Sequence, residues 1–331
     1  MKSIKNIFSF TIVLSLILIS VYLSGCNNDN NNGLSSNLTE DEYLTSAAIN
    51  TAFSNDADDD DNLFSNEISD FDSEGAVTDD DSGFDIPVDS LLKWGRRITN
   101  SNVNTNITTI GDTIKNVTVT RTINGNFIIV GYINGVLDST SKPYSQVQKR
   151  LVSFKRIQRK SNPKFNWRVY QYSAIDGETK MPQVGKDNII INKVEFYKNN
   201  NLFLTLNGPD FTTNIFNSRF FGGNGLFEVN RGDEVRTKVY VTSNQNDTDI
   251  VAFHWARNSF GFHRESFTMT SQTPNGSGFD RTYEKTFEIY SQHNRGIHNS
   301  FISANTRNSL YDNSLSLFSS TYLGIPYRVR P

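Results

Sequence analysis

The spacing of hydrophobic residues changes along the chain from a helical period to a period of two. After Thr39, apolar side chains recur at the three- and four-residue spacing of one helix face, at Tyr43, Leu44, Ala47, Ala48 and Ala52. Thr39 and Glu42 have the spacing of a capping box, which marks the start of a helix. We therefore expect a short helix from about Glu40 to Phe53. From residue 106 onward, apolar and polar positions alternate, as they do in β-strands.

Two long hairpins are expected in the middle of the chain. Asn124-Gly125 lies between the β-rich runs 117–123 and 127–130, and this dipeptide is the strongest short-range hairpin signal. A second hairpin is expected to join residues 151–157 to residues 167–174. A helix followed by antiparallel hairpins is the order of elements in an α+β domain.

Residues 90–180 are thus predicted to form a small α+β domain with two long hairpins. The stretch 150–174, with Phe154, Trp167 and Tyr170, is similar in pattern to the final hairpin of nuclear-transport-factor-like and cystatin-like α+β rolls. That resemblance implies a curved sheet, which could enclose a small apolar ligand.

Residues 186–331 are predicted to be entirely β. A compact hairpin joins 189–197 to 202–206, and more strand-like runs follow at 226–229, 235–241, 250–255, 267–269, 283–289, 297–304 and 322–329. Seven or more short strands between Asn, Gly and Asp turns predict an immunoglobulin-like antiparallel β-sandwich. The predicted fold class is therefore mainly β, with a small α+β domain followed by this sandwich.

A cluster of phenylalanines surrounds the glycines between residues 222 and 225, namely Phe211, Phe216, Phe220, Phe221 and Phe227. Such residues can close the open end of a sandwich, or they can form an exposed apolar binding loop. We expect them to close the sandwich.

The first 25 residues have the pattern of a signal peptide. Lys2 and Lys5 precede an apolar run, residues 7–22, that is shorter than the roughly 20 residues of a spanning helix. The next four residues, Leu23-Ser24-Gly25-Cys26, resemble the lipobox of bacterial lipoproteins, whose cysteine thiol takes a diacylglycerol. The resemblance implies a lipid on Cys26 that attaches the protein to a membrane. It also implies a location in the bacterial cell envelope, at the outer membrane or the cell surface.

Charge is divided sharply between the two ends of the chain. Residues 26–38 are expected to form an Asn-rich tether, and residues 39–89 an acidic, partly helical leader. Residues 27–92 carry 18 acidic residues, whereas residues 93–331 carry 30 basic and 17 acidic residues, a net charge of +13. Cys26 is the only cysteine, so the chain can form no internal disulfide and no zinc site built on thiolates.

The acidic leader contains one candidate calcium loop. Asp56, Asp58, Asp60 and Glu67 occupy positions 1, 3, 5 and 12 of a segment that looks like an EF-hand. Asp61, however, stands where the sharp turn of that loop requires glycine. The pattern therefore allows two interpretations, a weak calcium site or a solvated acidic face, and no other cofactor is predicted.

A basic stretch in the second hairpin is the candidate face for an anionic partner. It contains Lys149, Arg150, Lys155, Arg156, Lys164 and Arg168, interleaved with aromatic residues. Such surfaces bind anionic polymers, and for an exported protein an anionic glycan is a better candidate than nucleic acid, which we do not expect as a partner. The alternatives are a solvated face whose long side chains cover the sheet, or an intramolecular contact with the acidic leader.

The sequence gives no catalytic pattern. His254, His263, His293 and His298 lack the spacing of a His-Glu-x-x-His zinc site, and no Gly-x-Ser-x-Gly nucleophile elbow occurs. We therefore predict a lipid-anchored envelope protein that is not an enzyme and that binds or assembles with an envelope protein or an anionic glycan. The alternatives are an envelope glycan hydrolase and a carrier of a small apolar ligand in the α+β domain.

Overall fold

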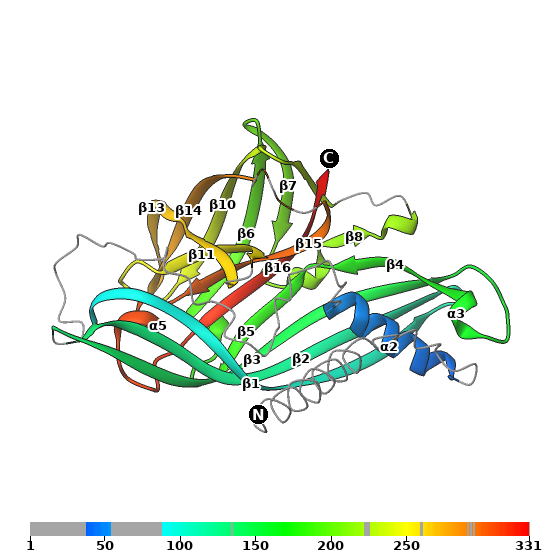
Figure 1. The fold of residues 1–331 in the computed structure, drawn as a ribbon, viewed down its shortest axis with the longest axis horizontal. Coiled ribbons are helices and arrows are strands. Elements are labelled where there is room, and N and C mark those ends of the chain that lie inside the picture. Colours follow the sequence, from blue (N-terminus) through cyan, green and yellow to red (C-terminus); the bar gives the residue numbers. More distant parts are fainter. Residues whose placement is uncertain are drawn as a thin grey trace, which may run out of the picture.

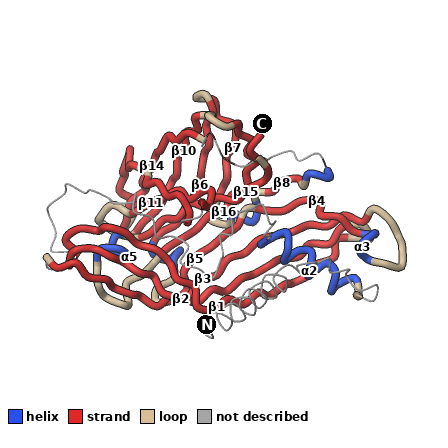
Figure 2. The backbone as a smooth tube through the Cα atoms, viewed as in Figure 1, coloured by secondary structure: helices blue, strands red, loops and turns tan. Residues whose placement is uncertain are grey.

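The computed structural model describes residues 38–53, 88–133, 135–221, 226–258, 261–289, 291, 293 and 295–330. Within these ranges the protein is mainly β, which confirms the predicted fold class; Figure 2 shows the few helices as short pieces beside long strands. The described helices are α2 (Glu40–Phe53), α3 (Pro163–Asn166), α4 (Gly185–Asn188) and α5 (Arg307–Tyr311), with 3-10 turns η1 (Phe211–Thr213) and η2 (Arg219–Phe221).

The larger of the two sheets contains strands from both the N-terminal and the C-terminal part of the described chain (Figure 1). Its strands follow the order β1–β2–β3–β5–β16–β15–β11–β12, all antiparallel, while β4 pairs with β3 and β8, and β9 pairs in parallel with β16. The strands are β1 (Val88–Ile110), β2 (Ile114–Ile133), β3 (Val136–Arg156), β4 (Trp167–Ser173), β5 (Ile175–Met181), β8 (Ile215–Asn217), β9 (Phe227–Asn230), β11 (Ile250–Asn258), β12 (Gly261–Ser266), β15 (Gly296–Asn305) and β16 (Ser320–Arg330).

The smaller sheet is antiparallel, in the order β13–β14–β10–β6–β7. Its strands are β6 (Ile189–Lys198), β7 (Asn201–Asn207), β10 (Glu234–Ser243), β13 (Thr268–Asn275) and β14 (Gly278–Glu288). The β6–β7 hairpin lies where the sequence predicts it. Asn199 and Asn200 both have positive φ at its turn, 51° and 61°, as a two-residue hairpin turn requires.

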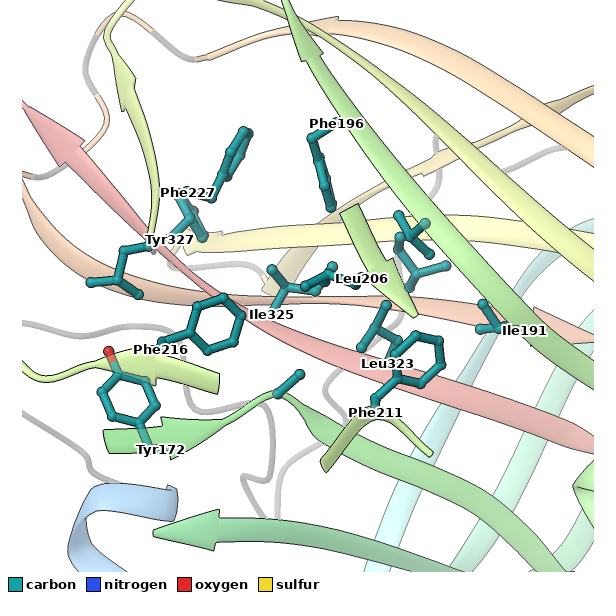
Figure 3. Close-up of a cluster of buried hydrophobic side chains, with 14 of the residues drawn as sticks. Tyr172, Ile191, Phe196, Leu206, Phe211, Phe216, Phe227, Leu323, Ile325 and Tyr327 are labelled. Atoms are coloured by element: carbon teal, nitrogen blue, oxygen red, sulfur yellow. The ribbon is translucent and has the colours of Figure 1, made fainter. Parts of the chain in front are cut away.

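The smaller sheet packs face to face on β16, β15 and β11, so a β-sandwich is present. Figure 3 shows Phe196 of β6 and Leu206 of β7 on the side facing Ile325 of β16. Of the five phenylalanines expected to close this sandwich, Phe221 is half-buried and packs edge-on against Tyr170 of β4. Phe211, Phe216 and Phe227 are buried in its core, while Phe220 is exposed.

The larger sheet continues across the boundary predicted between residues 180 and 186. The predicted β3–β4 hairpin is present, with Lys155 opposite Arg168. The chain turns at Ala174 into β5, which pairs with β3 on one side and with β16 on the other. The N-terminal hairpins and the C-terminal strands are therefore parts of one sheet, and the predicted division into domains stays a prediction.

A second core lies where β1 and β2 approach the C-terminal strands. Trp94 and Phe127 are buried there, and the Phe127 and Phe318 rings stack with their centres 4.3 Å apart. Lys142 is fully buried beside them, and its Nζ donates to three backbone carbonyls, those of Asn308, Ser309 and Leu317, at 2.8–3.1 Å. This ammonium group ties the segment around α5 to the sheet.

The predicted turn at Asn124-Gly125 is wrong, because β2 runs straight through both residues. Gly125 lies beside an irregularity in β1 between Ile98 and Asn100, and a Cβ atom on it would collide with the carbonyl oxygen of Arg97. Glycine is therefore needed here because two backbones approach closely, as is common beside a β-bulge.

Replacement of Gly125 by alanine should destabilise the fold by roughly 3 kcal/mol, because backbone atoms of β1 would have to move. The matched control is Gly111→Ala, where a Cβ meets nothing within 4 Å and only the positive φ of 60° opposes it; a cost of about 1 kcal/mol is expected there. Urea unfolding of the two variants measures the difference, and equal midpoints would contradict the close approach.

Candidate functional site

Helix α2 begins with the predicted capping box. The Glu42 carboxylate accepts hydrogen bonds from the Thr39 backbone N–H and from its hydroxyl, both at 2.8 Å. Leu44, Ala48 and Ala52 are buried on the helix face that packs on the sheet of β1, β2 and β3. The local sequence thus determines where the helix starts, and its small apolar side chains let it lie close to the sheet.

Basic side chains of the sheet hold both ends of α2. At the first turn, Lys115 Nζ lies 2.6 Å from Glu40 and 2.9 Å from Asp41, and Arg156 lies 3.2 Å from Glu40. At the last turn, Arg150 Nη1 donates to the carbonyl of Ala52 at 3.2 Å. Cations at a helix C-terminus and carboxylates at its N-terminus are both favoured by the helix dipole.

Arg150 is an interior residue, in contrast to its predicted place on an exposed face for an anionic partner. Its side chain is only 2% exposed, its Nε donates to the carbonyl of Ser173 at 2.8 Å, and its guanidinium lies over the Tyr172 ring. Burial lowers the pKa of Arg150 to about 10, so the group remains charged at neutral pH. Arg156 is also engaged, since it pairs with Glu40 and stacks over the Trp167 ring.

The other predicted residues of this face divide into two places. Lys149 lies opposite Asp176 in the β3–β5 ladder, whereas Lys155 and Arg168 face each other in the β3–β4 ladder. The Lys155 Nζ sits 5.3 Å from the centre of the Tyr170 ring. Lys164 belongs to α3, between the two strands. Three of the predicted six residues therefore gather at one end of the β3–β4 hairpin.

This end carries further basic and apolar side chains, and we call it the α3 tip. It consists of Lys155, Arg159, Lys160, Lys164, Phe165 and Arg168. Phe165 is 45% exposed. The chain has no acidic residue between Asp138 and Asp176. Within the described ranges, none of the five basic residues of the tip forms an ion pair, so the tip itself is cationic with the exposed ring of Phe165, while the acidic first turn of α2 lies next to it.

Local hydrogen bonds fix the shape of the α3 tip. The Asn162 side chain caps α3 by accepting from the Lys164 backbone N–H at 3.0 Å. Asn166 is buried, and its side chain bonds both backbone groups of Lys160, at 2.5 and 2.7 Å. Two asparagines thus satisfy loop backbone groups that would otherwise need water, and the basic side chains project from a defined support.

A small aromatic pocket in the second core is the other candidate site. It is lined by Trp94, Arg96, Phe127, His254, Phe301, Ser303, Asn305 and Tyr322. The Arg96 guanidinium lies over the rings of Phe301 and Tyr322 and fills the centre. No space for a water molecule remains between these side chains, whereas small-molecule sites usually have about 300–1,000 Å³. The pocket therefore does not favour a carrier role.

Three of the four histidines, His254, His293 and His298, lie in packing contacts. His254 is buried, stacks on Phe301 with 4.0 Å between ring centres, and lies 3.0 Å from the Ser303 hydroxyl. His293 and His298 share one cluster with Tyr327, whose hydroxyl is 2.7 Å from the His293 Nε2. Among the residues that the structure describes, no three His, Cys, Asp or Glu side chains come together as metal ligands would.

Cys26 and the candidate calcium ligands Asp56, Asp58, Asp60 and Glu67 lie outside the described residues. In the described part of the chain, none of the helices combines the length and the apolar character needed to cross a bilayer.

Neither a protein-family model nor a curated protein matches this chain. The site is therefore interpreted from its own residues.

Replacing Arg150 by methionine should loosen α2, because the Ala52 and Ser173 carbonyls lose a charged donor. A loss of about 2 kcal/mol in unfolding free energy is expected, together with faster hydrogen exchange across residues 40–53. Lys149→Met, one residue away on the other face of β3, is the control and should change stability by less than about 0.5 kcal/mol. Equal effects of the two variants would show that Arg150 does not hold the helix.

The docking of α2 should also depend on pH through Glu40. Burial raises the pKa of this carboxyl, but the hydrogen bond and charge of Lys115, with the charge of Arg156, outweigh it and leave the pKa below 4.5. The ionised group therefore stabilises the fold above about pH 4.5, and this contribution disappears as the pH falls through the folded-state pKa. Glu40→Gln should lower the urea midpoint more at pH 7 than at pH 3; a deficit of the same size at both pH values would contradict this.

Proposed function

We propose that the protein is a lipid-anchored component of the bacterial cell envelope with a non-catalytic binding or assembly role. The lipobox-like Leu23-Ser24-Gly25-Cys26 supports the anchor. The α3 tip is the observation that supports binding, because it presents five basic side chains and the exposed ring of Phe165 on a hydrogen-bonded loop and the adjoining ends of β3 and β4. Protein surfaces that combine positive charge with aromatic side chains suit anionic partners.

The partner class follows from the charge of this surface. An anionic glycan or an acidic face of an envelope protein would both be attracted to the α3 tip, and such attraction weakens as salt screens it. The proposed binding role of the α3 tip does not depend on the strand topology of the sandwich. Its immunoglobulin-like type stays a prediction.

Acylation of Cys26 is tested with a clickable fatty acid supplied to cells that make the full chain. The wild type should carry the label and remain with membranes after a high-salt wash. Cys26→Ser should lose the label and leave the membrane fraction in the same high-salt wash. A labelled Cys26→Ser variant, or an unlabelled wild type, would rule out the anchor on this residue.

The binding role is tested by cross-linked pull-down of the lipidated protein from native envelopes at low and high salt. A stoichiometric envelope protein or glycan should be recovered at low salt, and a Lys160→Glu, Lys164→Glu variant should recover less of it. Recovery of the same partner by wild type and variant at both salt concentrations would show that the α3 tip does not bind it.

A further inference from the structure

We propose that the α3 tip rests on an anionic membrane surface, the one into which the lipid on Cys26 inserts. This inference depends on the proposed lipid anchor, and it identifies the partner of the α3 tip as anionic lipid in place of the glycan or envelope protein, which become alternative outcomes of the test. It would make the β3–β4 end of the sheet the base of the molecule, with the sandwich held away from the bilayer.

The position of the first described residues supports this orientation. Twelve residues lead from Cys26 to Leu38, and they span at most about 40 Å when fully extended. Helix α2 starts at Glu40, which pairs with Arg156 at the end of β3. The tether therefore arrives beside the α3 tip, and Figure 1 shows α2 and α3 near the same end of the sheet.

The chemistry of the tip matches a lipid surface that carries negative charge. Lys155, Arg159, Lys160 and Lys164 are exposed. Each basic side chain close to an anionic membrane strengthens binding by roughly fivefold. The exposed ring of Phe165, with the Lys160 Nζ 5.6 Å from its centre, combines an apolar group for the interface with a cation for the headgroups.

A second exposed apolar site provides the comparison. Tyr132, Val136 and Leu137 are exposed around the β2–β3 turn. This turn lies at the far end of β2 from Lys115, about 60 Å away at the usual rise of a strand. Asp138 adds a negative charge there. The tether does not hold this turn near the membrane, and its charge does not attract anionic lipid.

The first test uses the mature chain with Cys26→Ser, purified without lipid, so that only the protein surface can bind. It should sediment with vesicles of phosphatidylethanolamine and phosphatidylglycerol but not with phosphatidylcholine alone. Binding should fall at least tenfold between 50 and 300 mM salt. Lys160→Glu with Lys164→Glu should weaken it at least twentyfold, whereas reversal of two other exposed bases, Arg97 and Lys180, should change it less than threefold.

The apolar contribution is tested with a matched pair on the same background. Phe165→Asp should weaken vesicle binding at least fivefold, and Leu137→Asp, at the distant turn, should not change it. Circular dichroism and urea unfolding confirm that each variant is folded. Equal binding by the wild type and the Lys160, Lys164 variant would overturn the proposal, as would equal losses in Phe165→Asp and Leu137→Asp.

The lipidated protein gives a second readout. Its acylated Cys26 cannot react with a thiol probe, so an environment-sensitive dye on Phe165→Cys reports only the α3 tip. Its emission should shift to the blue in phosphatidylglycerol vesicles, while the same dye on Leu137→Cys should not respond. No shift at Phe165→Cys would overturn the membrane contact even where the fatty-acid label on Cys26 confirms the anchor.

Three further outcomes separate the related hypotheses. Vesicle binding by the unlipidated chain without any label on Cys26 would support the lipid-binding tip and remove the anchor. Binding of a soluble anionic polysaccharide through Lys160 and Lys164, without vesicle binding, would replace the membrane with a glycan as the partner. Blue shifts of equal size at Phe165→Cys and Leu137→Cys would reject the proposed orientation.

Discussion

Strand β16 is buried on both of its faces, and the two cores of the molecule depend on it. Leu323 and Ile325 point into the sandwich, while Tyr322 belongs to the second core on the other side. Gly324 lies between them, where a Cβ atom would come within 2.8 Å of the Ile175 side chain on β5. Because the same strand pairs with β15, β5 and β9, a change in its register would disturb both cores together.

Successive side chains of β3 point to opposite faces of the sheet, and this gives neighbouring basic residues different roles. Arg150 and Arg156 lie on the face covered by α2, and their charges satisfy the two ends of that helix. Lys149 and Lys155 lie on the opposite face and remain exposed. A shift of the β3 register by one residue would bury the lysines without partners and expose the arginines. The docking of α2 and the exposure of the lysines at the α3 tip therefore both depend on the register of β3.

The parts of the fold that depend on local sequence could be predicted, and the parts that depend on distant segments could not. The capping box of α2 and the turn at Asn199 and Asn200 involve neighbours in the chain. The glycine at position 125 is explained only by Arg97 on another strand, a contact that the Asn-Gly pattern does not reveal. In the same way, half of the predicted basic residues gather at the α3 tip. Arg150 was misassigned because its partner, Ala52, lies 98 residues earlier in the chain.

The charge division of the sequence is compensated only locally in the described structure. Glu40 and Asp41 of α2 neutralise Lys115 and Arg156, which lie under the helix. The helix begins there, next to α3, and the hydrogen bonds of Asn162 and Asn166 hold the neighbouring loop in a fixed form. In the described structure these carboxylates pair with Lys115 and Arg156 and not with the lysines of the tip, and a movement of the loop backbone toward them would break its own hydrogen bonds. The positive charge of the α3 tip is thus maintained by the loop's own hydrogen bonds and remains available to a partner.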